Sequence, residues 1–235
     1  MIDPSRIIVA LDFSKKEDAL RIVDQLEGVI NFYKVGLELF LSEGHEILKI
    51  LKNKGKKIFL DLKFHDIPNT VYKAVQSVLQ YEIDMLTVHA LGGTEMMKKA
   101  ALAVKEYSYK ENIPPPKILA VTVLTSLDEK DLVEALSFPI SRESLVKNLA
   151  LKAKQVELDG VVSAVSSVKT IKQVCGQGFI VVTPGIRLKN SNFHDQKVVA
   201  TAHEAFSEGA DYIVIGRAIT HSNFPQRMIV DMINS

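Results

Sequence analysis

The sequence has little of several features that would narrow its function at once. It has one cysteine, Cys175, so no disulfide can form within the chain. Its 29 basic and 28 acidic residues leave a net charge of +1, without the basic excess of a nucleic-acid-binding protein. No apolar run reaches the roughly 18 residues that a membrane-spanning helix needs, and the N-terminus lacks the charged-then-apolar order of a signal peptide. We therefore expect a cytoplasmic protein that binds neither nucleic acid nor membrane.

The residues that are present predict an alternation of strands and helices. Hydrophobic residues make up 47% of the chain, which suffices for a sizeable core. Eight short runs are nearly continuously apolar, as parallel strands covered on both faces are. Amphipathic stretches such as 15–27 and 69–81 separate them and have helical spacing. The eight predicted strands are 6–12, 32–37, 57–63, 83–89, 117–125, 160–163, 179–183 and 211–216.

Eight such units in 235 residues, about 29 residues per unit, predict an α/β protein with a closed (β/α)8 TIM barrel. We find no linker and expect a single domain over residues 1–235. The competing architecture, a doubly wound open sheet, would be expected to have a GxGxxG turn after its first strand, and residues 12–15 (DFSK) have none. In a barrel the active site lies where the strands end, and polar residues do collect there along this chain.

The most informative segment lies at the end of the third predicted strand. Asp61 and Lys63 are two residues apart, so their side chains should point to one face of the strand. Lys34 on the neighbouring strand can reach the same cavity, and Asp66 follows on the loop. This alternation of lysine and aspartate suits a site that keeps one lysine protonated as an acid. A purely structural ion-pair network that closes the end of the barrel is the alternative.

Two loops combine glycine with arginine at the end of neighbouring strands. Residues 183–187 (TPGIR) follow the seventh predicted strand, and Gly216-Arg217 follow the eighth. Barrels usually hold phosphate groups on these two loops, because glycine lets backbone N–H groups approach the ligand and arginine offers several donors. The following polar stretch, 188–196, is long for such a loop and indicates a closing lid.

The segment 61–70 (DLKFHDIPNT) resembles the signature of the orotidine 5'-phosphate decarboxylase family, of the single-function bacterial type. The resemblance spans nearly the whole chain and involves several separate motifs in the same order. These motifs are VALD at 9–12, YKVGLE at 33–38, VTVLTS at 121–126, TPGIR at 183–187 and IGRAIT at 215–220.

The resemblance implies a reaction and a set of catalytic residues. The reaction is the decarboxylation of orotidine 5'-monophosphate to UMP, without metal or organic cofactor. Lys63 would donate a proton to C6 of the pyrimidine as carbon dioxide leaves, and Asp61 would lie beside the substrate carboxylate. Lys34 would hold Asp61 and the ribose hydroxyls, and Asp12 would bind a ribose hydroxyl. A fixed ammonium beside the reacting carbon would stabilise its developing negative charge and then protonate it.

The resemblance also implies a homodimer, in which Asp66 and Thr70 reach across the interface to the neighbouring site. It implies that Gln196 bridges the phosphate region and the base. The other substrate-binding residues that it implies are Arg187, Gly216 and Arg217 at the phosphate, and Thr125 and Ser126 at the pyrimidine edge.

Two alternative functions remain open at this point. A magnesium-dependent sugar-phosphate decarboxylase or aldolase of the same barrel group shares the Asp-x-Lys-x-x-Asp pattern and the phosphate loops. Those enzymes carry a metal-binding glutamate on the second strand, where this chain has Lys34, and a lysine there opposes a dication. The other alternative is a catalytically silent nucleotide-binding module, for which nothing requires Lys63.

Overall fold

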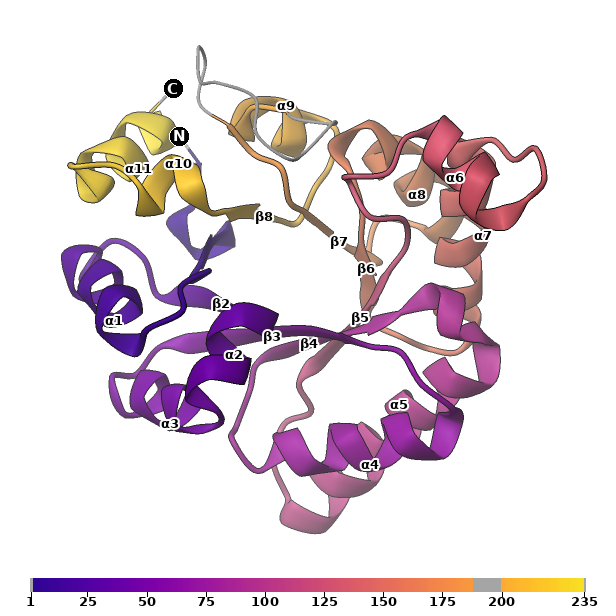
Figure 1. Ribbon diagram of the computed structural model, residues 1–235, viewed down its shortest axis with the longest axis horizontal. Helices are drawn as coiled ribbons and strands as arrows, with labels where there is room; N and C mark the ends of the chain where they lie inside the picture. Colours follow the sequence, from indigo (N-terminus) through magenta and orange to yellow (C-terminus); the bar gives the residue numbers. More distant parts are fainter. Residues whose placement is uncertain (1, 188–199, 235) are drawn as a thin grey trace.

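A closed barrel of eight parallel strands forms the centre of the protein (Figure 1). The computed structural model describes residues 2–187 and 200–234. Each strand is hydrogen-bonded to its neighbours in chain order, and β8 pairs with β1 to close the ring, which confirms the predicted (β/α)8 barrel. The strands are β1 (Ile7–Ala10), β2 (Phe32–Gly36), β3 (Lys57–Phe64), β4 (Met85–His89), β5 (Lys117–Val121), β6 (Gly160–Val162), β7 (Ile180–Thr183) and β8 (Tyr212–Ile215).

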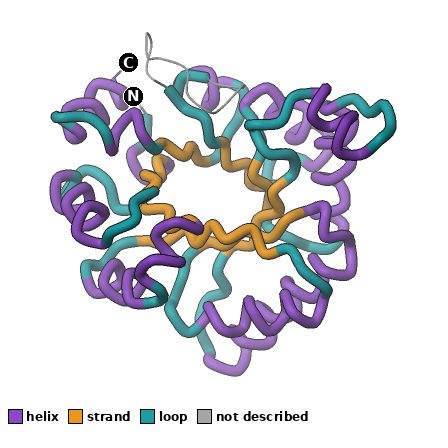
Figure 2. The backbone as a smooth tube through the Cα atoms, viewed as in Figure 1, coloured by secondary structure: helices purple, strands orange, loops and turns teal. Residues whose placement is uncertain are grey.

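Helices surround the ring of strands on its outside (Figure 2). In the part of the chain that the structure describes, none of them is long and apolar enough to cross a membrane. The two ends of the chain meet beside the barrel, where the backbone N–H of Ile2 donates to the carbonyl of Ile233 at 2.9 Å. The α-helices are α1 (Lys16–Gln25), α2 (Leu37–Glu43), α3 (Glu46–Asn53), α4 (Pro68–Leu79), α5 (Gly93–Glu111), α6 (Glu129–Leu136), α7 (Arg142–Gln155), α8 (Val168–Cys175), α9 (Ala202–Ser207), α10 (Arg217–Thr220) and α11 (Pro225–Asn234).

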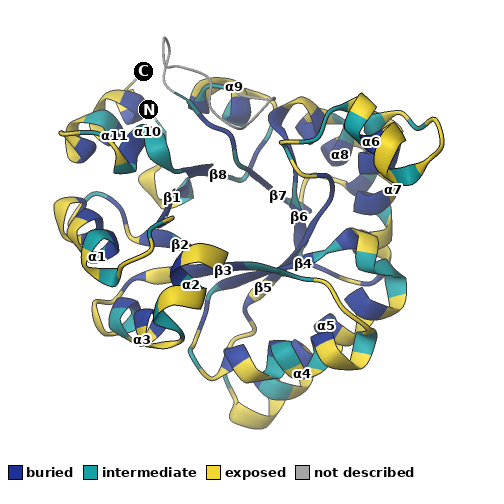
Figure 3. Cartoon of the chain, viewed as in Figure 1, coloured by how far each residue is buried: buried dark blue, intermediate teal, exposed yellow. Residues whose placement is uncertain are grey.

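The apolar core has two layers. The larger layer lies between the strands and the helices, and it includes outward-facing strand residues such as Leu60, Leu86 and Val161. The smaller layer fills the interior of the barrel and includes Phe59 and Met85. The strands are therefore buried on both faces, whereas the helices are exposed on their outer faces (Figure 3). This explains why the strand segments read as continuous apolar runs.

A repeated carboxylate contact fixes the opposite end of the barrel, where the strands begin. The aspartate directly before each of β4, β6 and β8 accepts a backbone hydrogen bond from the start of the preceding strand and also pairs with a lysine. A buried backbone N–H needs such an acceptor. The three sets are Asp84 with Ile58 and Lys52, Asp159 with Ile118 and Lys117, and Asp211 with Val181 and Lys172.

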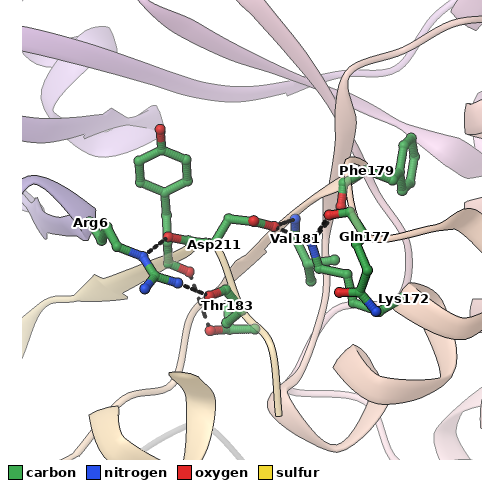
Figure 4. Close-up of polar contacts among 9 residues, drawn as sticks. Arg6, Lys172, Gln177, Phe179, Val181, Thr183 and Asp211 are labelled. Carbon is green, nitrogen blue, oxygen red and sulfur yellow. Dashed lines mark hydrogen bonds and ion pairs between the residues drawn. The ribbon is translucent and has the colours of Figure 1, made fainter. Parts of the chain in front are cut away.

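The set at Asp211 contains the most buried lysine of the three, and Figure 4 shows its contacts. The amine of Lys172, whose side chain is only 5% exposed, lies 2.7 Å from the Asp211 carboxylate. The same amine donates to the carbonyls of Gln177 and Phe179 at 2.9 Å. Arg6, just before β1, donates to the carbonyl of Asp211 at 2.8 Å. These contacts link the start of β1 to the starts of β7 and β8, at the end opposite the barrel mouth.

Some strands end earlier than their apolar runs predict. β1 ends at Ala10 and β5 ends at Val121. Asp12, Thr125 and Ser126 therefore lie in the loops that follow these strands and do not close the strands themselves. The hydrogen bonds between neighbouring strands end where the chain turns toward the next helix. A local apolar pattern does not predict the residue at which this happens.

Candidate active site

The inward-facing residues of the first four strands change from apolar to polar at the barrel mouth. The interior layer of the core consists of Ile8, Ala10, Phe32, Phe59, Met85, Leu119, Val182 and Val214. Side chains two positions further along a strand face the same side. After Ala10, Phe32, Phe59 and Met85 these positions hold Asp12, Lys34, Asp61 and Thr87. The barrel thus presents three charged groups and a hydroxyl above an apolar floor.

β3 departs from regular geometry at the residue that carries the next charge. Lys63 has a φ of 50°, in the left-handed region that side-chain-bearing residues rarely adopt. The pairing of β3 with β4 shifts register between Leu60 and Phe64. Sequence alternation predicts that Asp61 and Lys63 share a face, and their side chains do meet. The irregular backbone at Lys63 was not foreseen, so the regular alternation that motivated the prediction ends at this residue.

Four charged side chains form a continuous series of ion pairs at the mouth. The amine of Lys34 lies 2.9 Å from Asp12 Oδ1 and 3.7 Å from Asp61 Oδ2. The amine of Lys63 lies 2.9 Å from the same Asp61 oxygen. Aspartate and lysine therefore alternate in space in the order Asp12, Lys34, Asp61, Lys63. The Lys34 and Asp61 side chains are each only 11% exposed, whereas Asp12 is 51% exposed and Lys63 is 31% exposed.

The two buried members of this series hold each other in the charged form. Burial disfavours the charge on Lys34, but attraction to Asp12 and Asp61 outweighs it, so the pKa of Lys34 lies above its ordinary value. Burial also disfavours the charge on Asp61, but attraction to Lys34 and Lys63, with hydrogen bonds from Lys63 and Thr87, keeps the pKa of Asp61 below its usual range. The mouth therefore carries fixed ammonium and carboxylate groups at neutral pH.

These charges lie in the wall of a cavity of about 570 Å³. Of the predicted site residues, the cavity wall contains Asp12, Lys34, Asp61, Lys63, Thr125, Arg187, Gly216 and Arg217. Ser126 is exposed and is not part of this wall. Asp66 and Thr70 are also exposed and outside the wall. Gln196 and the predicted lid over 188–196 lie outside the described residues.

The two glycine-arginine loops meet on one side of this cavity. Gly185 has a positive φ of 83°, a conformation that glycine adopts without strain, and Arg187 follows it in the cavity wall. The backbone N–H of Arg187 donates to the carbonyl of Ala200 at 2.9 Å, so the two residues that flank 188–199 are hydrogen-bonded to each other. Gly216 and Arg217 lie in the wall from the neighbouring strand. Two arginines and two glycines from neighbouring loops therefore line this part of the cavity.

Four further residues belong to the site and were not singled out from the sequence. Ser163, Gly36 and His221 line the cavity, and Thr87 lies beneath it. A Cβ atom at Gly36 would lie 2.8 Å from the Lys34 amine and 3.2 Å from Asp12 Oδ1, so a side chain there would displace the Lys34 amine. The alternation of inward positions along β2 and β4 would have found Gly36 and Thr87. No sequence signal distinguishes Ser163 or His221.

The two histidines near the mouth stack on each other. The rings of His65 and His89 lie 5.2 Å apart with an interplanar angle of 17°. Nδ1 of His89 accepts a hydrogen bond from the backbone N–H of Leu91 at 3.3 Å. Burial, with repulsion from His65 and Lys63, lowers the pKa of His89 to about 4. Within residues 2–187 and 200–234, no group of three or more histidine, cysteine or acidic side chains is arranged to hold a metal ion.

The fold and this cavity define a (β/α)8-barrel protein with an ionic site beside two glycine-arginine loops. Residues 5–230 match the model of the Orotidine 5'-phosphate decarboxylase / HUMPS family. The chain belongs to this family.

Proteins named orotidine 5'-phosphate decarboxylase resemble the chain over most of its length. The orotidine 5'-phosphate decarboxylase of Carboxydothermus hydrogenoformans is 50% identical over 215 residues, which cover 91% of this chain and 88% of that protein. The corresponding protein of a Nostoc species is 44% identical, with 94% and 92% covered.

Solved structures resemble the whole barrel. The crystal structure of orotidine 5'-phosphate decarboxylase from Lactobacillus acidophilus has a TM-score of 0.84 and 36% identity, with 98% of this chain and 100% of that chain covered. An uncharacterized conserved protein from Geobacillus kaustophilus has a TM-score of 0.85 and 37% identity, with 97% and 98% covered.

Proposed function

We propose that this chain decarboxylates orotidine 5'-monophosphate to UMP and carbon dioxide, the last step of de novo pyrimidine nucleotide synthesis. The observation that carries the proposal is the alternating series Asp12–Lys34–Asp61–Lys63 in the wall of one cavity. Family membership and the names of the relatives support it. The enzyme is a carboxy-lyase that needs neither a metal ion nor an organic cofactor.

Lys63 is the group that reacts with the substrate in this proposal. When the carboxylate leaves the pyrimidine, its bonding electrons remain on C6, which has no attached electron sink. The Lys63 ammonium stabilises this charge and then transfers a proton to C6, which completes UMP. The contact of its amine with Asp61 at 2.9 Å supports a fixed position for that proton.

The remaining charged residues orient the reacting groups. Asp61 lies beside the substrate carboxylate and holds the amine of Lys63. Lys34 links Asp61 to Asp12 and, with Asp12, binds the ribose hydroxyls. The half-exposed carboxylate of Asp12 is accessible to a ligand in the cavity, which supports this role.

The other end of the cavity binds the phosphate group. Arg187, Gly216 and Arg217 contact it from the loops after β7 and β8, where barrels commonly bind phosphate. Gln196 bridges this region and the base. Thr125 reads the pyrimidine edge, and its position in the cavity wall favours it over the neighbouring Ser126.

The magnesium-dependent branch of the same barrel group is the second candidate. Its members need a carboxylate on β2 for the metal, and this chain has Lys34 there. The Lys34 amine lies between two carboxylates, 2.9 Å from Asp12 and 3.7 Å from Asp61. A fixed ammonium at that point repels a dication from the acidic groups that would otherwise bind it. The observation therefore favours the metal-independent reaction.

We further propose that the active form is a homodimer in which Asp66 and Thr70 complete the neighbouring site. Asp66 is exposed, and one of its carboxylate oxygens accepts a hydrogen bond from the backbone N–H of Ile67 at 2.6 Å. The Ile67 side chain beside it is 68% exposed. An exposed carboxylate and an exposed apolar residue on one loop are consistent with an interface.

A mixing experiment tests the shared site. The Lys63→Ala and Asp66→Ala variants should each be inactive alone. After the two are unfolded together and refolded, mixed dimers should regain activity, because one of their two sites then contains both native residues. If no activity returns although mixed dimers form, Asp66 does not act across the interface.

Turnover by the purified protein tests the reaction itself. With orotidine 5'-monophosphate and excess EDTA, the absorbance of the substrate should fall and UMP should appear. Orotidine, which lacks the phosphate, should be a much poorer substrate. Activity that disappears with EDTA and returns with magnesium would point to the metal-dependent branch, and equal turnover of orotidine would refute the phosphate assignment.

A further inference from the structure

The hydroxyl of Thr87 joins two parts of the proposed catalytic series through a single atom. Thr87 lies on β4, faces the barrel interior and is completely buried. Its Oγ1 accepts a hydrogen bond from the backbone N–H of Lys63 at 2.9 Å. The same Oγ1 donates to Asp61 Oδ1 at 2.9 Å. One hydroxyl therefore contacts both the backbone of one residue and the side chain of the other.

The contact with Asp61 fixes which carboxylate oxygen faces the lysines. Oδ1 is occupied by the Thr87 hydroxyl, and Oδ2 is the oxygen near both the Lys63 and Lys34 amines. Without the first bond, only the contacts with the two lysines would limit rotation of the carboxylate about its Cβ–Cγ bond. The Thr87 hydrogen bond therefore determines the direction in which Asp61 holds the Lys63 amine.

The contact with Lys63 satisfies its backbone N–H in an unusual conformation. Lys63 has a positive φ of 50°, and β3 shifts register against β4 around it. In a regular ladder its N–H would donate to a carbonyl of the neighbouring strand, and here it donates to the Thr87 side chain. Without this acceptor, a buried N–H in a rarely adopted conformation has no partner.

We propose that Thr87 is a positioning residue for the Lys63 amine, an inference that rests on the proposed decarboxylation. It does not touch the substrate, since it lies outside the cavity wall. It acts through the backbone of Lys63 and the carboxylate of Asp61 at once. Its hydroxyl, rather than its size, is the functional element.

The test compares Thr87→Val, which keeps the shape of the side chain without the hydroxyl, with Thr87→Ser, which keeps the hydroxyl. For Thr87→Val we expect kcat for orotidine 5'-monophosphate to fall about 10- to 100-fold, as small misplacements of reacting groups do, while KM stays near that of the wild type. Thr87→Ser should recover most of kcat. Ser108→Ala is a control for the loss of a buried hydroxyl away from the site, because Ser108 on α5 is 7% exposed and its Oγ has no hydrogen-bond partner among the described residues.

Crystal structures of the variants give a readout that does not depend on turnover. In Thr87→Val, Lys63 should leave its left-handed conformation or its amine should move away from Asp61, and in Thr87→Ser both features should persist. An active wild type with an equally active Thr87→Val variant would overturn the inference. So would an unchanged Lys63 in the Thr87→Val structure. An inactive wild type would refute the proposed function instead, and the structures would still decide whether Thr87 positions Lys63.

Discussion

Replacement of Asp61 by asparagine should separate catalysis from stability. The asparagine oxygen can still accept the Thr87 hydrogen bond. Its NH2 group would face the amines of Lys63 and Lys34, which lie 2.9 and 3.7 Å from the native Oδ2. Two donors cannot share a hydrogen bond, so Lys63 should turn away from its native position. Loss of one aligned group of this kind costs about 3 to 4 kcal/mol of transition-state stabilisation, or about 100- to 1000-fold in kcat/KM.

The free energy of unfolding should change far less. Asp61 loses its ion pairs, but the variant no longer buries a carboxylate whose side chain is 11% exposed and whose desolvation opposes those attractions. Lys34 keeps Asp12 at 2.9 Å, and Lys63 is 31% exposed, so water can solvate its amine. We expect the two changes to cancel to within about 1 kcal/mol at neutral pH.

The pH dependence of this difference has a definite sign. Because the pKa of Asp61 is lowered in the folded protein, its contribution to stability is present above its unfolded pKa and is lost as the pH falls through the folded pKa. The free energy of unfolding of the wild type should therefore decrease more steeply in acid than that of Asp61→Asn. Urea denaturation at a series of pH values measures both curves.

A matched control is Asp18→Asn, which removes an exposed carboxylate that pairs with Arg21 at 3.1 Å. It should change neither activity nor stability. If Asp61→Asn retained kcat/KM within about tenfold of the wild type, its proposed role in holding Lys63 would be wrong. If it lost about 3 to 5 kcal/mol of stability, as a broken buried ion pair does, the mouth would be a structural network instead.

Three further variants test separate parts of the structure. Gly36→Ala should lower kcat/KM about tenfold or more without unfolding the protein, because its Cβ would lie 2.8 Å from the Lys34 amine; steady-state kinetics and circular dichroism measure the two effects. Lys172→Met should lower the unfolding temperature and leave kcat unchanged, because it leaves the Asp211 carboxylate without its amine at the far end of the barrel; an unchanged melting curve would contradict this. Arg217→Ala should raise KM for the nucleotide and lower kcat/KM, and it should have little effect on turnover of orotidine, which has no phosphate to bind.

The barrel could be predicted because its strands are buried on both faces. Seven of the eight apolar runs contain one strand of the structure each, and β3 extends one residue beyond its run, to Phe64. The polar residues that end those runs lie at one end of a closed sheet, so closure alone brings them together. The assignment of Asp61, Lys63 and Lys34 to one cavity required only side-chain alternation and neighbouring strands.

Features that depend on an interruption of regular structure could not be predicted. The left-handed conformation of Lys63 and the register shift between β3 and β4 involve two strands that lie apart in the sequence, so a local pattern does not contain them. Alternation places Thr87 and Gly36 on the inner face, but the contacts of Thr87 with Lys63 and Asp61, and the closeness of Gly36 to Lys34, exist only in the folded chain. The proposed contribution of Asp66 and Thr70 concerns a second copy of the chain, which one barrel does not include.

The most direct test of the central claim is the turnover of orotidine 5'-monophosphate by Lys63→Ala, measured with chelator present. Lys98→Ala is the control, because Lys98 is 55% exposed and pairs only with nearby Glu95 in the described structure. If the Lys63 ammonium stabilises and protonates C6, the variant should fold, bind UMP and form no detectable UMP from the substrate, while Lys98→Ala keeps the wild-type rate. Turnover by a folded Lys63→Ala variant at the wild-type rate would contradict the account.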